Sequence, residues 1–117
     1  MSITRQHTNQ RMSQIVVHGG LVYLAGQVAS GAPGASVTDQ TRDILDRIDR
    51  YLAEAGTDKT KLLTASIWLT DIATFDEMNA VWDAWVAPGA TPARACVEAR
   101  LASPQYTVEI MVTAALS

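Results

Sequence analysis

The last β-rich segment of the chain constrains the fold most, because its side chains divide between two unlike faces. From Tyr106 to Ala115 the residues alternate with a period of two, as in a strand with one face buried. One set is apolar, namely Val108, Ile110, Val112 and Ala114. The other set is mixed, namely Thr107, Glu109, Met111 and Thr113. Such a strand belongs in a sheet with one covered face and one face of different character.

Four other segments have the pattern of strands. Gln14–His18 and Leu21–Ala25 flank Gly19-Gly20, which predicts a β-hairpin after a polar N-terminal arm. Leu63–Thr70 and Ala93–Arg100 alternate between two faces. In the first of these the apolar face carries Leu63, Ala65, Ile67 and Leu69. In the second, Arg94, Cys96, Glu98 and Arg100 share one face and the small residues share the other.

Two segments between the strands have helical spacing. Ser36–Asp39 has the spacing of a capping box, and Gly56 is a typical C-cap, so a helix is expected to run to about Ala55. Thr74–Glu77 is a second capping box, and the helix it begins should end before Pro88-Gly89. The apolar stripe of the second helix, interpreted as core, is Met78, Val81, Trp82, Trp85 and Val86.

The order strand, strand, helix, strand, helix, strand, strand predicts a single α+β domain over residues 1–117. Two helices should cover one face of a mixed sheet and leave the other face bare. The bare face is expected to carry Thr64, Trp68, Arg94, Cys96, Glu98, Thr107, Glu109, Met111 and Thr113. This composition is intermediate between core and solvent surface, so we expect a closed homo-oligomer with a pocket in its interface.

Composition narrows the possible functions. Nine Lys and Arg against twelve Asp and Glu give a net charge of -3 without a basic stripe, so no nucleic acid partner is expected. Apolar runs fall short of the roughly 20 residues of a membrane span, and the polar start does not predict a secretory signal. The single cysteine, Cys96, excludes an internal disulfide and favours a cytoplasmic location.

Arg94 and Glu109 are the first candidates for a site, because both are assigned to the bare face on strands expected to be antiparallel neighbours. An ion pair between Arg94 and Glu109 in a subunit interface would explain why both residues are there. A ligand site would explain it as well, because a guanidinium binds a small carboxylate or phosphate in bidentate fashion.

Other candidates are weaker on pattern alone. Gly26, at the end of a strand, marks either a plain strand end or a close approach of a ligand to the backbone. Cys96 has no nearby base in the sequence, since the histidines are His7 in the arm and His18 at the hairpin turn. Neither a metal site nor a phosphate-binding glycine loop is predicted.

Several segments resemble the Rid family, the reactive intermediate deaminases also called YjgF-type proteins. Thr91–Glu98 and Tyr106–Ile110 are similar to the C-terminal signature of the family. Val22–Gln27, Gln40–Gly56 and Leu69–Asn79 resemble three other family segments in the same order. The resemblance extends over nearly the whole chain.

This resemblance implies a chorismate-mutase-like α+β fold and a homotrimer with three ligand clefts between subunits. In enzymatic members, the arginine of the Pro-Ala-Arg motif holds the carboxylate of a 2-imino acid, such as 2-iminobutanoate or 2-iminopropanoate. Water hydrolyses the imine to a 2-oxo acid and ammonia, without cofactor or metal. The arginine corresponds to Arg94, and Glu109 corresponds to the acid that positions water or a substrate polar group. The backbone of Gly26 and of Cys96 would line the pocket.

The segment before the first strand departs from the family pattern. Many members have Pro-Tyr-Ser-Gln where this chain has Arg11–Gln14, so Ser13 matches a pocket position and Met12 replaces the pocket tyrosine. This start, together with Trp82–Val86, is closer to the YoaB-like branch. Arg11 could serve the ligand or only the surface. A binding protein for small carboxylates is therefore an alternative to a deaminase, and an endoribonuclease or translation inhibitor disagrees with the charge.

Overall fold

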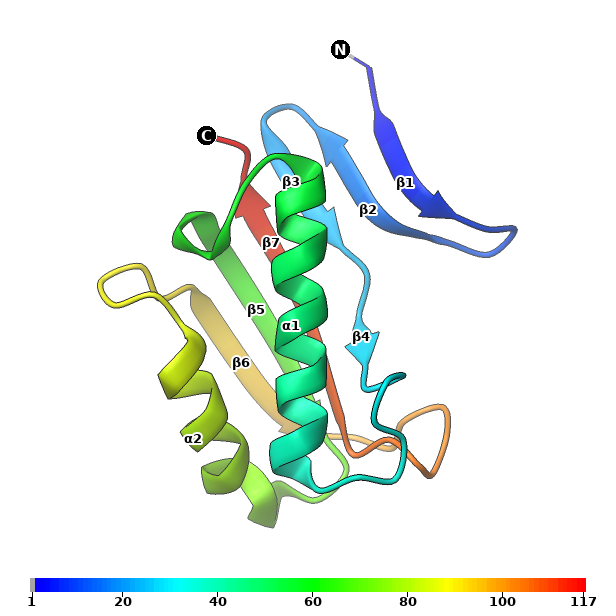
Figure 1. Ribbon diagram of the computed structural model, residues 1–117, viewed down its shortest axis with the longest axis vertical. Helices are drawn as coiled ribbons and strands as arrows, with labels where there is room; N and C mark the ends of the chain where they lie inside the picture. The colour runs from blue at the N-terminus through cyan, green and yellow to red at the C-terminus, as the bar shows by residue number, and fades with distance from the viewer. Residues whose placement is uncertain (1) are drawn as a thin grey trace.

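The computed structural model describes residues 2–117, and Met1 lies outside the described residues. Within this range the strands form a seven-stranded sheet of order β1-β2-β3-β7-β5-β6, with β4 paired to β7 (Figure 1). The strands are β1 (Thr4–Thr8), β2 (Ser13–His18), β3 (Leu21–Leu24), β4 (Gln27–Val28), β5 (Leu62–Leu69), β6 (Ala93–Glu98) and β7 (Val108–Ala115). The helices are α1 (Val37–Ala55) and α2 (Phe75–Trp85), with short 3-10 turns at Lys59–Lys61 and Ile72–Thr74.

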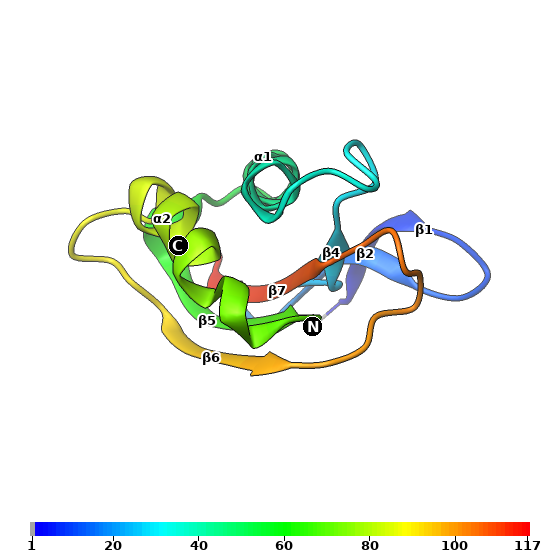
Figure 2. The same ribbon diagram turned by 90° about the horizontal axis from the view of Figure 1, so that it is seen from below.

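Both helices lie on the same face of the sheet, as Figure 2 shows. The sheet is mixed, because β5 and β6 run parallel while β7 is antiparallel to β3, β4 and β5. The predicted α+β architecture, with two helices on one face, is confirmed. We call this the helix-covered face and the opposite one the bare face.

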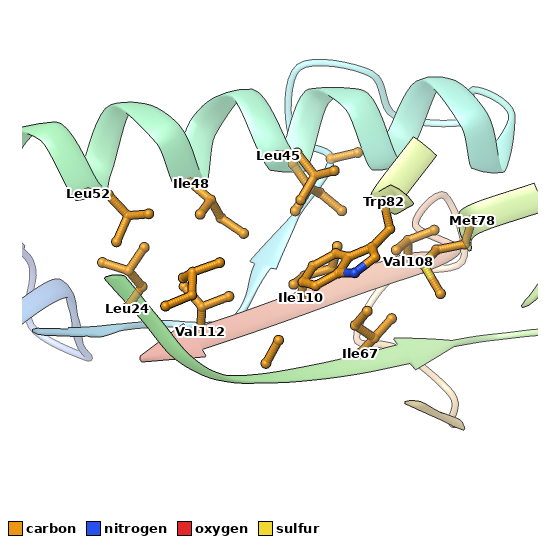
Figure 3. Close-up of a cluster of buried hydrophobic side chains, with 14 of the residues drawn as sticks. Leu24, Leu45, Ile48, Leu52, Ile67, Met78, Trp82, Val108, Ile110 and Val112 are labelled. Atoms are coloured by element: carbon orange, nitrogen blue, oxygen red, sulfur yellow. The ribbon is translucent and has the colours of Figure 1, made fainter. Parts of the chain in front are cut away.

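Helix α1 begins and ends as the sequence predicts. The Ser36 hydroxyl accepts a hydrogen bond from the Asp39 amide at 3.1 Å, and Gly56 adopts the left-handed conformation, with φ at 93°. Ile44, Ile48 and Leu52 are fully buried. In Figure 3, Ile48 and Leu52 point from the helix toward the sheet. Burying one such side chain contributes about 2 kcal/mol to folding, so this stripe fixes the helix on the sheet.

Helix α2 contributes the other side of the core. Met78 and Trp82 are buried, and in Figure 3 they point toward Ile67 of β5 and Val108 of β7. Both were predicted as core residues, and this is confirmed. Trp85 lies closer to the surface and donates from its indole nitrogen to Asp49 of α1 at 3.0 Å. The two helices are thereby joined above the sheet.

The N-terminal arm is a strand, which the sequence analysis did not predict. β1 pairs antiparallel with β2, with Gln6 opposite Ile15. Its residues are mostly exposed, and an edge strand that buries little surface needs no apolar alternation. β1 therefore lacks the alternation of apolar and polar residues from which the other strands were predicted. β4, with two residues, is too short to leave a pattern.

The capping box predicted at the start of α2 is wrong. Thr74 makes no side-chain cap, and its hydroxyl donates instead to the carbonyl of Asp71 at 2.7 Å. Glu77 reaches across to the other helix and accepts from both the amide and the hydroxyl of Thr38, each at 2.9 Å. The acid predicted to stabilise the start of α2 thus caps the first turn of α1.

Strand β5 contains an irregularity that reverses one predicted orientation. Its register against β7 shifts between Leu62 and Thr64. In consequence Leu62 is buried, whereas Leu63, predicted as a core residue, is 42% exposed. Ala65, Ile67 and Leu69 are buried as predicted.

Candidate functional site

Arg94 lies on the helix-covered face of the sheet, although the sequence analysis placed it on the bare face. In the register of the sheet it shares a row with Ala65 of β5 and Val112 of β7, both of which are buried. Side chains in register on paired strands point to the same face. The guanidinium accordingly contacts helix α2. The predicted orientation of Arg94 is therefore wrong.

The same correction applies to the rest of strand β6. Cys96 packs against the hydrophobic core, and the carboxylate of Glu98 accepts from the Ile72 amide at 3.0 Å on the helix side. Val97, assigned to the covered side by sequence, is 51% exposed on the bare face. The error has a physical cause, because β6 is an edge strand. Its small residues do not mark the covered side, and an arginine can pack its aliphatic stem beneath a helix.

The guanidinium of Arg94 is held by neutral groups. It donates to the side-chain oxygen of Asn79 on α2 at 2.8 Å. Its central carbon lies 5.4 Å from the ring centre of Trp82 and 5.8 Å from that of Phe75, within the range of cation–π attraction. No Asp or Glu of residues 2–117 forms an ion pair with it. The side chain is thus oriented, while its charge remains available to an anion.

Glu109 lies on the bare face, as predicted. It is in register with Trp68 of β5 and with Val28 of β4. Its carboxylate lies directly against Gly26, where an added Cβ would meet Oε2 inside van der Waals contact. Burial raises the pKa of this carboxyl above its usual range. Because burial disfavours the charged form, the carboxylate of Glu109 accepts a proton more readily than that of an exposed glutamate.

Arg94 and Glu109 of one chain do not meet. They lie on opposite faces, and β5 separates β6 from β7 in the sheet. The prediction that their strands are neighbours is wrong, because the segment after β6 crosses β5 before β7 begins. Neither an ion pair nor a pocket formed by these two side chains exists within a single chain.

The bend around Gly26 is held by a buried amide. Gln27, which is 5% exposed, donates to the side-chain oxygen of Gln14 at 2.7 Å and to the carbonyl of Ala25 at 3.0 Å. This pair ties the end of β3 to β2. The backbone of Gly26 is therefore fixed close to Glu109. Sequence reasoning singled out Gly26 but missed Gln27, whose burial has no signature in the pattern.

Met12 and Ser13 lie at the tip of the β1–β2 hairpin. The side-chain oxygen of Asn9 accepts from the amides of Arg11 and Met12 at 2.7 and 2.9 Å, which fixes the turn. The Ser13 hydroxyl is hydrogen-bonded to that of Thr8 at 2.8 Å. Met12 is 45% exposed, and Arg11 is exposed as well. These residues lie on a structural element separate from both Arg94 and Glu109.

The thiol of Cys96 is poorly suited to act as a nucleophile. Burial raises its pKa above the usual value, and the nearby charge of Arg94 only partly opposes this. A thiol must lose its proton to attack, so at neutral pH this one is inert. A role for the Cys96 side chain in chemistry is not supported by its surroundings.

The bare face combines apolar and hydroxyl side chains. Trp68 and Met111 lie on it, and the hydroxyls of Thr64 and Thr113 are hydrogen-bonded at 2.5 Å. A cavity of about 750 Å³ lies at the loop between β6 and β7, and Thr70, which follows β5, is one of the residues that line it. Arg100, Leu101, Pro104 and Tyr106 also line it. The cavity was not predicted from the sequence.

The described residues offer few candidates for other classes of site. Within residues 2–117, no three His, Cys, Asp or Glu side chains are grouped so that they could hold a metal ion. None of the helices in that range has the length and apolar character needed to cross a bilayer.

Comparison with known proteins decides the family. Residues 3–116 match the family model described as Endoribonuclease L-PSP. A RutC family protein of Haemophilus ducreyi is 44% identical over 115 residues, which cover 98% of this chain and 97% of the relative. This chain belongs to the Rid (YjgF-type) family. The RutC family protein YoaB of Escherichia coli is 38% identical over 116 residues, covering 99% and 100% of the two chains.

Solved structures of Rid relatives have the same fold. A YjgF family member from Neisseria meningitidis is 50% identical with a TM-score of 0.96, covering 100% of this chain and 97% of that one. A YjgF-type protein from Mycobacterium tuberculosis is 30% identical with a TM-score of 0.86, covering 97% and 99%. The resemblance found in the sequence motifs is thereby confirmed over the whole domain.

Proposed function

We propose that this Rid protein is a deaminase that hydrolyses reactive 2-imino acids, such as 2-iminobutanoate and 2-iminopropanoate, to 2-oxo acids and ammonia. The observation that carries the proposal is the environment of Arg94. Its guanidinium is oriented by Asn79 and two aromatic rings, and no carboxylate of residues 2–117 neutralises it. A preoriented, unneutralised arginine fits the carboxylate that every 2-imino acid carries.

The geometry of the chain favours a site shared between protomers. Arg94 is at the edge strand on the helix-covered face, whereas Glu109 and Gly26 are on the bare face. In a closed ring, the edge of one sheet can lie against the bare face of the next. We propose a homotrimer in which Arg94 of one protomer faces the cleft that contains Glu109 of its neighbour. Trp68, Val97 and Met111 would supply the apolar part of this interface.

The proposed chemistry requires little of the protein. Arg94 binds the substrate carboxylate and so fixes the imine carbon in the cleft. Glu109, whose pKa is raised by burial, takes a proton from a water molecule as its oxygen attacks that carbon. The proton then passes to the nitrogen of the carbinolamine. As the carbon–nitrogen bond breaks, Glu109 takes the proton of the carbinol hydroxyl, so that ammonia and a 2-oxo acid leave, and this proton is then released to water. The protonated imine is already electrophilic, so no cofactor enters the reaction.

The replacement at Met12 favours a second candidate. The thioether of Met12 can neither donate a hydrogen bond as a phenol does nor carry a proton. A site that lacks such a group could hold a small carboxylate without converting it, which would make the protein a metabolite-binding regulator. In that case 2-oxobutanoate would raise the thermal unfolding midpoint although no imine is hydrolysed.

The description of the matching family model names an endoribonuclease. The net charge of -3 argues against this activity for the present chain, because RNA binding depends on neutralising phosphates. RNA cleavage by nuclease-free protein, abolished in Arg94→Ala, would reverse this judgement.

Imine hydrolysis tests the proposal directly. An amino-acid oxidase generates the 2-imino acid in situ, and semicarbazide traps what remains. Wild-type protein should lower the amount of trapped imine, and Arg94→Ala should lose about a hundredfold in kcat/KM. Arg42→Ala is the matched control, because Arg42 is an exposed cation on α1. Equal activity of wild type and Arg94→Ala would refute the proposal.

Oligomeric state and location are separate parts of the proposal. Size-exclusion chromatography should give about three times the monomer mass. A monomer would leave Arg94 and Glu109 without a shared cleft. The cytoplasmic location expected from the single cysteine stays a prediction.

A further inference from the structure

Besides the pairing of β2 with β3, the β1–β2 hairpin makes an unusual contact with the rest of the protein at His7. β1 is an edge strand paired with β2. In Figure 1 the hairpin projects beyond helix α1, with its turn away from the core. Its tip carries Met12 and Ser13, the two positions at which the sequence resemblance places ligand contacts. How this tip is held therefore matters for the proposed site.

His7 has a backbone conformation that its place in a strand does not explain. Its φ of 52° lies in the left-handed region, and no other residue of 2–117 except glycine has a positive φ. A non-glycine residue adopts this conformation only when its surroundings compensate for the strain. Such residues cluster at functional sites, so the compensating contact needs to be identified.

The contact is made with helix α1. In the register of β1 and β2, Gln6 lies opposite the buried Ile15, so Gln6 points to the helix-covered face. By alternation His7 should point to the bare face. Instead its ring lies 5.1 Å from the ring of Tyr51, and its Nε2 lies 2.5 Å from Oε2 of Glu54, both on α1. The left-handed backbone accompanies this reversal of the side chain.

The link continues from His7 to the tip. The next residue, Thr8, shares a hydrogen bond of 2.8 Å with the hydroxyl of Ser13. Asn9 then fixes the amides of Arg11 and Met12 through its side-chain oxygen. Glu54 on α1 is therefore connected to both tip residues through His7, the peptide bonds of residues 7–9, and the hydrogen bonds made by Thr8 and Asn9.

We propose that His7 is a positioning residue, which fixes the β1–β2 hairpin on α1 through Glu54 and Tyr51 and thereby sets the position of Met12 and Ser13. The expected effect of His7 on ligand affinity rests on the proposed function. Its effect on the position of the hairpin is independent of that function.

Amide hydrogen exchange of the full-length protein tests the hairpin part. His7→Ala and Glu54→Ala should each speed exchange of the backbone amides in β1 and its turn by about fivefold, as expected for loss of one partly exposed polar contact. The double variant should be no faster than His7→Ala, because both changes break the same link. Tyr51→Phe keeps the ring and should exchange like wild type. Unchanged exchange in both single variants would overturn the proposal.

Ligand binding separates a positioning role from a structural one. His7→Ala and Glu54→Ala should raise KM for the imine by about threefold with kcat unchanged, since only the placement of the tip is altered. An equal fall in kcat and kcat/KM would overturn the positioning role. If wild-type protein neither converts nor binds these ligands, the proposed function fails, and the exchange experiment still decides whether His7 holds the hairpin.

Discussion

The carboxylate of Glu109 lies against the backbone of Gly26, at a place where any larger residue would collide with it. The contact joins the start of β4 to β7 on the bare face of the sheet. It explains why glycine stands here although its φ is not positive. The constraint is the space beside the carboxylate rather than the conformation of the chain.

Gly26→Ala should therefore impair activity more than stability. An added methyl group would push the carboxylate aside, and a flexible acid can move without unfolding the sheet. We expect about a tenfold loss in kcat/KM with a small change in the thermal unfolding midpoint. Gly31→Ala is a matched control, because its methyl group would also meet a carboxylate, that of Asp43, outside the proposed site. Similar losses of activity in both variants would contradict the role of Glu109.

Asn79 should act on the reaction only through Arg94. Asn79→Ala removes the acceptor that orients the guanidinium, so KM should rise by about tenfold. Asn79→Asp retains an acceptor but adds a charge that neutralises Arg94, and its KM should rise further. Steady-state kinetics of the two variants distinguish orientation from charge. A milder defect in Asn79→Asp than in Asn79→Ala would show that the free charge of Arg94 is not used.

The raised pKa of Glu109 predicts the pH dependence of activity. Glu109 must be ionised to accept a proton, so kcat/KM should fall as the pH decreases through a pKa above the usual range of glutamate. Glu109→Gln should be nearly inactive and should lack this limb of the profile. A pH profile of the trapped-imine assay measures it. If kcat/KM falls only at the ordinary pKa of glutamate, the proposal that burial raises the pKa of Glu109 is contradicted.

The same shift predicts a pH-dependent effect on stability. Since the folded state binds this proton more tightly than the unfolded state, stability is fully present at low pH and declines as the pH rises through the raised pKa. The gain in unfolding free energy of Glu109→Gln over wild type should therefore grow as the pH rises from the ordinary pKa of glutamate, about 4.3, through the raised pKa of the folded state. Urea unfolding at several pH values measures the difference. The exposed Asp83→Asn serves as control, and a gain that shrinks with rising pH would contradict the sign.

Glu77 should stabilise the start of α1 rather than that of α2. It accepts two hydrogen bonds from Thr38 in the first turn of α1, where a negative charge is also favoured by the helix dipole. Glu77→Ala should lower the free energy of unfolding by about 1 kcal/mol. Asp76→Ala, which removes the neighbouring acid of α2, should cost less than half of that. Denaturant titrations followed by circular dichroism compare them, and equal costs would contradict the contact.

The sequence predicted the fold wherever burial imposes a period. α1, α2 and the alternation of β7 follow from positions such as Ile48, Met78 and Ile110, whose burial needs the right spacing. Prediction from the sequence was wrong or incomplete for the two edge strands of the sheet, β1 and β6. β1 has no buried face, and on β6 the charged and the small residues are nearly equally exposed, so the pattern could not show which side helix α2 covers.

The sequence motifs pointed to candidate residues for a site but not to the arrangement of these residues in the folded chain. Motifs pointed to Arg94, Glu109 and Gly26 without reference to the folded chain. That Arg94 and Glu109 lie on opposite faces depends on β5 lying between their strands, which is a long-range pairing absent from local sequence. Asn79 could have been suspected only after Arg94 was known to face α2.

Mixing two inactive variants tests the central claim most directly, namely that Arg94 of one protomer acts with Glu109 of another. Arg94→Ala and Glu109→Gln are co-expressed with different tags, and assemblies that carry both tags are isolated. If the site is shared, every trimer that contains both variants has one intact cleft out of three, and imine hydrolysis should return to about a third of the wild-type rate. If the mixed assemblies remain as inactive as either variant alone while wild type is active, the shared site is contradicted.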